Sequence, residues 1–168
     1  MMVSGLTPTL FFYNPNIDPQ EEYFTRKKEV IDFATRRTIP FVDADYDKEL
    51  WLSAIKGFED EPEGGKRCEQ CFRLRLEQTA RYASEHNFNV FTTTLGISRY
   101  KNFEKITALG RAIAAEYPGL IYWDYNWRKK GGSERMYRVA KEEGFYMQDY
   151  CGCLFSRLSA QRNQKIKK

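Results

Sequence analysis

Short apolar runs separated by helical patterns constrain the fold of this chain more than any other feature. The first run, residues 9–14, shows no alternation of apolar and polar side chains, and the third, residues 89–95, is rich in β-branched residues. Such runs suit strands that are buried on both faces of a parallel sheet. Two further runs, at about residues 39–42 and 120–125, complete four predicted strands. The alternation predicts one α/β domain over residues 1–168 with a mainly parallel sheet, in which residues 1–8 and 157–168 are flexible ends.

The segments between the runs carry helical periodicity. Asp18 is the expected N-cap of the first helix, with Pro19 at its first helical position, and Gly144 is the expected stop of the last one. The predicted helices cover about residues 20–37, 48–58, 67–87, 103–117 and 133–143. Their inward-facing residues are expected to be Tyr23, Val30, Phe33 and Ala34, then Trp51, Leu52 and Ile55, then Phe72, Leu74, Leu76, Ala80 and Ala83.

Composition excludes disordered and membrane-spanning classes. The chain has 168 residues, 42% hydrophobic and 30% charged, with a net charge of +4, and no apolar run approaches the length of a membrane span. Neither a signal peptide nor a membrane anchor is recognisable, so a cytoplasmic location is expected. Four basic residues lie in the segment 162–168, which suits either a solvated end or contact with RNA phosphates.

Cysteine occurs as two close pairs. Cys68 and Cys71 lie where a loop rich in acidic residues and glycine turns into a helix, and three-residue spacing places both on one side of a helical turn. Such a pair can share a metal or close a disulfide, and a helix N-terminus favours the thiolate. The second pair, Cys151 and Cys153, is separated only by Gly152. A Cys-x-Cys disulfide closes a small, strained ring, which is typical of redox-active pairs.

Spacing alone leaves two interpretations of these pairs. All four cysteines could form one zinc or iron–sulfur site. Alternatively, Cys68 and Cys71 hold part of a cluster while Cys151 and Cys153 cycle between dithiol and disulfide. Zinc ribbons carry their pairs in hairpins, whereas the first pair here opens a helix, so a zinc ribbon is the less favoured interpretation.

Polar residues follow the strands. In open α/β sheets the loops after the carboxyl ends of the strands build the ligand site, which favours Thr93, Thr94 and Lys101 as contacts for a polar or anionic ligand. Arg128 and Lys129 lie in a basic loop after the fourth strand, near aromatic residues that could stack on bases. The alternative is ordinary: Ser98 or Asn102 caps a helix and the basic side chains are solvated. Likewise, Asp43, Asp45 and Asp47 could bind a cation or serve as turn and cap residues.

Several motifs in a fixed order resemble one family. They are Phe11-Phe12-Tyr13-Asn14-Pro15-Asn16-Ile17, the loop 59–65 followed by Arg67-Cys68-x-x-Cys71, Phe91-Thr92-Thr93-Thr94-Leu95, and Tyr150-Cys151-Gly152-Cys153. Each is weak alone, but together they extend from about residue 9 to 156 in the order of the QueH-type epoxyqueuosine reductases, which the chain resembles.

The resemblance implies a fold, a reaction and a cofactor. The fold would be a three-layer α/β/α arrangement of the adenine-nucleotide-hydrolase-like (HUP-like) group. The reaction would be reduction of epoxyqueuosine to queuosine in the anticodon stem-loop of tRNA, supplied by an electron donor whose identity the sequence does not reveal. Cys68 and Cys71 would be two of the four ligands of a [4Fe-4S] cluster. Cys151 and Cys153 would be the redox-active pair.

One part of the family pattern is missing from this sequence. Family members carry a strand, an adjacent Cys-Cys and a helix before the Phe-Phe-Tyr-Asn-Pro-Asn motif, a unit of about 25–30 residues. Residues 1–8 contain no cysteine. The expectation is that the first strand, the first helix and two cluster ligands are absent, and that the chain as given cannot assemble the cluster unaided.

Two functions of other classes remain open at this point. A non-catalytic zinc-binding module would use both cysteine pairs and contain zinc but no iron. An inactive tRNA-binding remnant would bind RNA equally well after each cysteine is replaced by serine.

Overall fold

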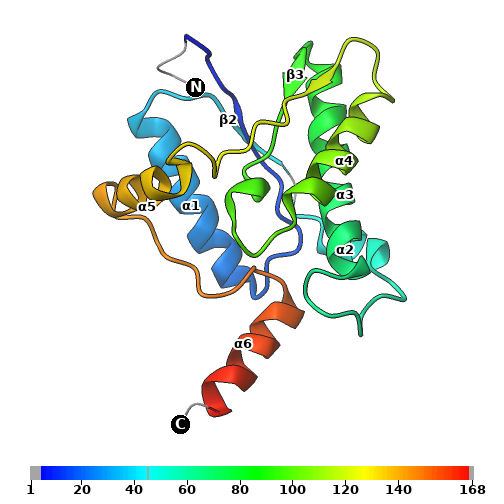
Figure 1. Ribbon diagram of the computed structural model, residues 1–168, viewed down its shortest axis with the longest axis vertical. Helices are drawn as coiled ribbons and strands as arrows, with labels where there is room; N and C mark the ends of the chain where they lie inside the picture. The colour runs from blue at the N-terminus through cyan, green and yellow to red at the C-terminus, as the bar shows by residue number, and fades with distance from the viewer. Residues whose placement is uncertain (1–4, 45, 167–168) are drawn as a thin grey trace. The chain divides into compact units, whose positions relative to one another are not determined.

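The computed structural model describes residues 5–44 and 46–166. Strands and helices alternate along most of the chain (Figure 1), which confirms the predicted α/β class, whereas the three-layer arrangement stays a prediction. In chain order the elements are β1 (Leu10–Phe12), α1 (Gln20–Arg36), β2 (Phe41–Asp43), α2 (Lys48–Ala54), α3 (Lys66–Glu85), β3 (Val90–Phe91), the 3₁₀ helix η2 (Leu95–Ile97), α4 (Phe103–Ala114), β4 (Ile121–Tyr122), α5 (Gly132–Glu142) and α6 (Leu154–Ile166).

Contacts within the chain divide it into two compact units. One unit runs to Leu50 and takes up the chain again from Phe145, and the other covers Trp51–Gly144. Each unit contains one two-stranded parallel sheet, β1–β2 in the first and β3–β4 in the second. Parallel pairing of strands that are joined through a helix is the expected outcome of a βαβ connection.

The first unit packs α1 against its small sheet. In the sheet, Leu10 pairs with Phe41 and Phe12 with Asp43. The core is aromatic: Tyr23 of α1 meets Phe12 edge to face, with ring centroids 5.5 Å apart, and lies 4.2 Å from the ring of Tyr46. Edge-to-face and tilted pairs of this kind stabilise a core beyond the area they bury.

The second unit is built around the pairing of α3 with α4, which run side by side in Figure 1. Gly110 of α4 is buried because the ring of Tyr122 lies against it, and a Cβ at this position would come within 2.6 Å of that ring. Glycine thus lets α4 approach β4 closely. The buried core of this unit comprises Phe72, Leu76, Ala80, Ala83, Phe91, Leu95, Ile106, Ile113, Ala114, Leu120 and Tyr122.

All five predicted helices are present, although α2 ends at Ala54, before the predicted end at residue 58, and the strands are also shorter than predicted. All five residues expected to face inward from α3 are buried. In α2 the prediction holds for Trp51 and is wrong for Leu52, which is 37% exposed. β3 and β4 retain only two residues each, and Val90 and Ile121 are 48% and 61% exposed. β-branched residues therefore predicted extended backbone correctly here, but they did not predict burial of both faces of the strand.

Helix ends account for two of the polar residues whose role the sequence left open. Asp47 Oδ1 accepts a hydrogen bond from Leu50 N at 2.8 Å, and Asn102 Oδ1 accepts one from Lys105 N at 3.0 Å, so both residues cap helices. Asp43 pairs with Lys27. Asp45 lies outside the described residues. The predicted cap role is thus confirmed for Asp47, whereas the ion pair of Asp43 was not predicted.

The predicted cap at Asp18 is wrong. Pro19, in extended backbone conformation, occupies the N-cap position of α1, and no side-chain hydrogen bond caps this helix. The carboxylate of Asp18 forms ion pairs instead.

The last helix, α6, was not predicted from the sequence. It begins directly after Cys153 and covers most of the segment expected to be a flexible end. None of the helices in residues 5–44 and 46–166 has both the length and the apolar character needed to cross a lipid bilayer.

Candidate functional site

Cys68 and Cys71 lie in the first turns of α3, as predicted. The helix begins at Lys66 with Gly65 as its N-cap, so both cysteines sit near the N-terminal end, where the helix dipole favours an anion. Both side chains are half-buried, and Cys68 packs against the core of the second unit. The N–H of Gly64 donates to Cys68 Sγ at 3.2 Å. An amide N–H directed at sulfur stabilises negative charge on it, which suits a thiolate ligand.

The loop before α3 is held against the helix by a buried arginine. Arg67 is only 6% exposed, and its Nη1 donates to the carbonyl oxygen of Glu59 at 2.7 Å and to that of Glu61. The side chain of Glu61 accepts a hydrogen bond from Lys66 N at 3.2 Å. These contacts fold the acidic loop back over the first turn of α3 and so place Gly64 at Cys68.

The turn fits part of an iron–sulfur site. A [4Fe-4S] cluster takes four thiolate ligands, and Cys68 and Cys71, three residues apart in one helix, could supply two of them. In the part of the chain that the structure describes, no three His, Cys, Asp or Glu side chains gather where they could hold one metal ion. The two thiolates therefore fit as half of such a ligand set and do not make a complete one.

Cys151 and Cys153 belong to the other unit and precede α6. Cys153 is buried, with 8% exposure, and Cys151 is half-buried. Between them Gly152 has φ of +124°, and a Cβ there would lie 3.0 Å from Nη1 of Arg26 and 3.3 Å from the side chain of Ile17. Only glycine fits this backbone conformation and this space. The pair is thus held in a turn that a larger residue would disrupt.

Asp18 connects this turn to Lys48 and Arg157, two other parts of the first unit. Its carboxylate, which is 11% exposed, pairs with Lys48 Nζ at 2.5 Å and with Arg157 Nη2 at 2.6 Å. Its backbone N–H donates to the carbonyl oxygen of Gly152 at 2.8 Å. The hydrogen bond from Lys48 to Asp18 raises the pKa of the Lys48 ammonium above its ordinary value. A shielded carboxylate with two cationic partners fixes the positions of the groups that it binds.

Tyr150 also belongs to this network and has an unusual titration. Its hydroxyl donates to the backbone oxygen of Asp18 at 2.7 Å. Burial raises the pKa of Tyr150 to about 12, and the negative charge of Glu22 adds to the effect. The phenol therefore stays protonated in the folded protein at a pH where a tyrosine in the unfolded chain has ionised.

We expect the folded state to lose stability between about pH 10 and 12, in part through Tyr150. The unfolded chain releases the phenol proton near its ordinary pKa of 10.0, whereas the folded chain keeps it to about 12. The folded state binds more protons in this window, so its stability is fully present below pH 10 and falls as the pH rises. Urea unfolding at several alkaline pH values measures this loss. In Tyr150→Phe the slope of stability against pH should be smaller, and an unchanged slope would contradict the assignment.

The loops after β3 and β4 carry the polar residues predicted to bind substrate. Thr93 is half-buried, and its hydroxyl accepts a hydrogen bond from Leu95 N at 3.2 Å. Thr94 is exposed at the N-cap of η2, and Lys101 is half-buried. Arg128 reaches from the second loop toward the first: its Nη1 lies 3.5 Å from the carbonyl oxygen of Ser98. Lys129 is exposed. The structure thus brings Arg128 to the loop that contains Thr94 and Lys101.

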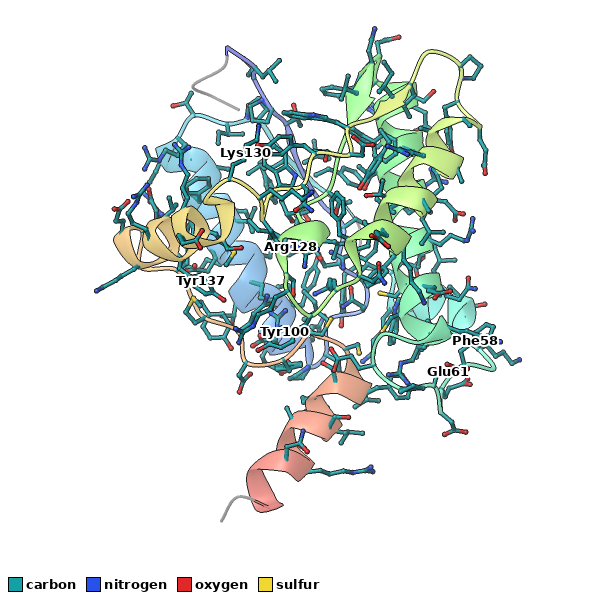
Figure 2. The ribbon with its side chains drawn as sticks, in the orientation of Figure 1. Phe58, Glu61, Tyr100, Arg128, Lys130 and Tyr137 are labelled. Carbon is teal, nitrogen blue, oxygen red and sulfur yellow. The ribbon has the colours of Figure 1, made fainter. Side chains whose placement is uncertain are left out.

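Aromatic rings accompany these basic residues. Trp123, Tyr125 and Trp127 contact one another, with ring centroids 4.8–6.0 Å apart. On the neighbouring loop the guanidinium of Arg99 lies over the ring of Tyr100, which is 75% exposed. Figure 2 labels Tyr100 and Arg128, which come from these two loops. Proteins that bind single-stranded nucleic acid stack its bases on exposed aromatic rings and bind its phosphates with nearby cationic groups.

Sequence reasoning missed Arg26 and the true role of Asp18. Arg26 lies in α1 and donates to the backbone of the cysteine turn more than a hundred residues away. The spacing of Arg26 four residues after Glu22 predicts a helical ion pair, which is present, but no pattern links it to Cys151.

Comparison with known proteins gives a consistent result. The family model described as "Epoxyqueuosine reductase QueH" matches residues 1–159. A relative of that name from Histophilus somni (strain 129Pt) is 54% identical over 153 residues, which cover 91% of this chain and 63% of the relative. The relative of the same name from Haemophilus influenzae is 53% identical over 93% of this chain and 64% of its own length. The relative of the same name from Thermotoga maritima is 40% identical over 88% of this chain and 78% of its own length.

The chain thus spans somewhat less than two thirds of the length of the first two of these relatives. The match still includes both cysteine pairs, the Asp18 network and the loops after β3 and β4. On this evidence the chain belongs to the epoxyqueuosine reductase QueH family.

Proposed function

We propose that this protein reduces epoxyqueuosine to queuosine in tRNA, in the cytoplasm. The observation that carries the proposal is the family match over residues 1–159, within which both predicted cysteine pairs lie. The structure supports it with a Cys-x-Cys turn in a specific conformation and with loops whose side chains suit RNA. The relatives carry this activity in their names.

The reaction removes one oxygen atom. Both carbon–oxygen bonds of the epoxide break, a carbon–carbon double bond forms, and the oxygen leaves as water. This requires two electrons and two protons. When the thiols of Cys151 and Cys153 form a disulfide, they release two electrons and two protons, so one dithiol balances one epoxide. An electron donor must then reopen the disulfide before the next turnover.

Cys68 and Cys71 are proposed as two ligands of a [4Fe-4S] cluster. Their place in the first turns of α3 and the Gly64 N–H bond to Cys68 support this role. When bound, such a cluster supplies one-electron transfer.

The loops after β3 and β4 are proposed to contact the tRNA. Thr93 and Thr94 would bind hydroxyl groups of the modified base or ribose. Lys101, Arg128 and Lys129 would bind phosphate, which makes affinity fall as salt rises. Because loop bases in RNA are unstacked, exposed rings such as Tyr100 and Tyr125 offer them a surface.

A direct assay tests the function. The purified protein is incubated with an anticodon stem-loop RNA that carries epoxyqueuosine and with a chemical reductant. The RNA is then digested, and its nucleosides are separated and identified by mass spectrometry. With iron, sulfide and a small thiol supplied for the two cluster ligands that Cys68 and Cys71 leave open, we expect queuosine to replace epoxyqueuosine in proportion to protein. Binding of the RNA without conversion under reducing conditions, with iron and sulfide supplied, would contradict the proposal.

A further inference from the structure

Every carbonyl oxygen from Tyr150 to Cys153 accepts a hydrogen bond. Arg26 binds the first two carbonyls, Asp18 N donates to Gly152 O at 2.8 Å, and Arg157 N donates to Cys153 O at 3.0 Å. The N–H of Cys151 donates to the hydroxyl oxygen of Ser156 at 3.0 Å. All four carbonyl oxygens of this segment are thus hydrogen-bonded, as carbonyls are within a helix or a strand.

Arg26 donates two of these four hydrogen bonds, and all three nitrogens of its guanidinium are hydrogen-bonded. Nε donates to Glu22 Oε1 at 2.7 Å, Nη1 to Cys151 O at 3.2 Å and Nη2 to Tyr150 O at 3.2 Å. The guanidinium carbon lies 5.2 Å from the centre of the Tyr150 ring, in cation–π contact. The side chains of Arg26 and Glu22 are each only 12% exposed, so this arrangement is shielded from water.

The two hydrogen bonds from the guanidinium of Arg26 restrict the backbone between the two cysteines. Two adjacent carbonyls are bound by two nitrogens of one rigid plane, which restricts the backbone on the N-terminal side of Gly152. Asp18 and Arg157 restrict it on the other side. Glycine would otherwise give the segment between the thiols the greatest conformational freedom of any residue. The network removes that freedom before the thiols react.

We propose that Arg26 is a positioning residue that holds the Cys151-Gly152-Cys153 turn in the conformation from which its two thiols close a disulfide. The proposal rests on the proposed redox role of this pair. Closing the small ring orders the turn, and that ordering costs conformational entropy. Because Arg26 has already ordered the turn, the disulfide is more stable relative to the dithiol than it would be in a free segment.

The disulfide equilibrium of the turn tests this proposal. The protein is equilibrated with reduced and oxidised glutathione at defined ratios. Oxidised glutathione accepts the two electrons and two protons and yields two reduced molecules as the Cys151–Cys153 bond forms. After acid quenching and alkylation, peptide mapping by mass spectrometry gives the fraction of this disulfide. The variants are Arg26→Gln, Arg26→Lys and Glu22→Gln, and the matched control is Lys28→Gln.

The control removes a positive charge from the same helix. Lys28 is exposed and pairs with Asp32, so its replacement alters charge without touching the turn. Arg26→Lys keeps the charge but replaces the planar fork with a single ammonium. Glu22→Gln keeps Arg26 and removes the negative charge to which its Nε and the Tyr146 hydroxyl donate. Circular dichroism establishes that each variant is folded, and Glu22→Gln serves as the test if both Arg26 variants fail to fold.

We expect both Arg26 variants to disfavour the disulfide about tenfold, which is about 30 mV for a two-electron couple. Glu22→Gln should shift the equilibrium in the same direction by less, and Lys28→Gln should stay within about twofold of the parent. A parent-like equilibrium in Arg26→Lys would overturn the proposal, because the charge alone would then suffice without the two hydrogen bonds of the guanidinium. Equilibria unchanged in every variant, or shifted toward the disulfide, would overturn the proposal.

The same experiment separates this proposal from the proposed function. If the parent protein forms no Cys151–Cys153 disulfide with oxidised glutathione, the redox role of the pair fails, and the positioning role fails with it. If the parent forms the disulfide and the Arg26 variants match it, only the positioning role fails.

Discussion

Replacing Cys153 by alanine is expected to abolish the conversion of epoxyqueuosine to queuosine while RNA binding is retained. The remaining thiol of Cys151 cannot form an intramolecular disulfide with a partner two residues away, so the two electrons that the epoxide requires are no longer available from the turn. Alanine is the appropriate replacement because Cys153 is only 8% exposed, and a serine would bury a hydroxyl there. Nucleoside analysis of the RNA after reaction measures the loss.

Two comparisons make this result specific. Cys151→Ala should lose conversion equally, because the proposed oxidation consumes both thiols. Ser159→Ala alters an exposed residue of α6 and should convert epoxyqueuosine as the parent does. If Cys153→Ala still produces queuosine through repeated turnovers, the electrons reach the epoxide by another route and the pair is not the immediate donor.

The second large effect is expected on stability. Ile113 lies in α4 with 0% exposure and belongs to the core between α3 and α4. Truncating a fully buried isoleucine to alanine removes apolar contacts and leaves a cavity, at a cost of about 2–5 kcal/mol. Such a loss is a large part of the stability of an ordinary domain. Urea unfolding followed by circular dichroism gives the change in the free energy of unfolding.

The same chemical change at an exposed site is the control. Ile121 in β4 belongs to the same unit and is 61% exposed, so Ile121→Ala leaves no buried cavity and should cost less than about 1 kcal/mol. Equal losses from the two variants would show that the core between α3 and α4 is not packed as the structure has it.

Helical periodicity was the most informative signal in the sequence. The spacing of Phe72, Leu76 and Ala80 placed the buried face of α3 correctly, because side chains three and four residues apart share one face whatever lies opposite. The strands were predicted less well. Val90 and Ile121 belong to strands of two residues in two-stranded sheets, and such strands leave side chains exposed that a wider sheet would cover.

The cysteine pairs show where a local pattern is sufficient. The acidic, glycine-containing loop before Cys68 and the apolar periodicity after it predicted that a helix begins at this pair, and α3 begins at Lys66. The contact of Gly64 with Cys68 is also local, since four residues separate them. The roles of the pairs in a cluster and in a redox cycle remain proposals.

The Asp18 and Arg26 networks show where a local pattern is insufficient. Asp18 before a proline matched the signature of a helix cap, yet its carboxylate binds Lys48 and Arg157. The backbone N–H groups of a helix end and any nearby cation compete for the same carboxylate. Two cations in a shielded site bind it more strongly than one backbone N–H does. The sequence contains no sign of this competition, because Arg157 lies 139 residues away.

The amino-acid sequence by itself determined the α/β class, the buried face of α3, the positions of the two cysteine pairs and the resemblance to one family. These depend on periodicity and on residue type, which act over a few residues. Only the tertiary structure decided that the Cys151-Gly152-Cys153 turn is bonded at every carbonyl, with Arg26 of α1 at its centre. The physical reason is that hydrogen bonds and ion pairs depend on distance in space, and the fold alone brings residue 26 to residue 151.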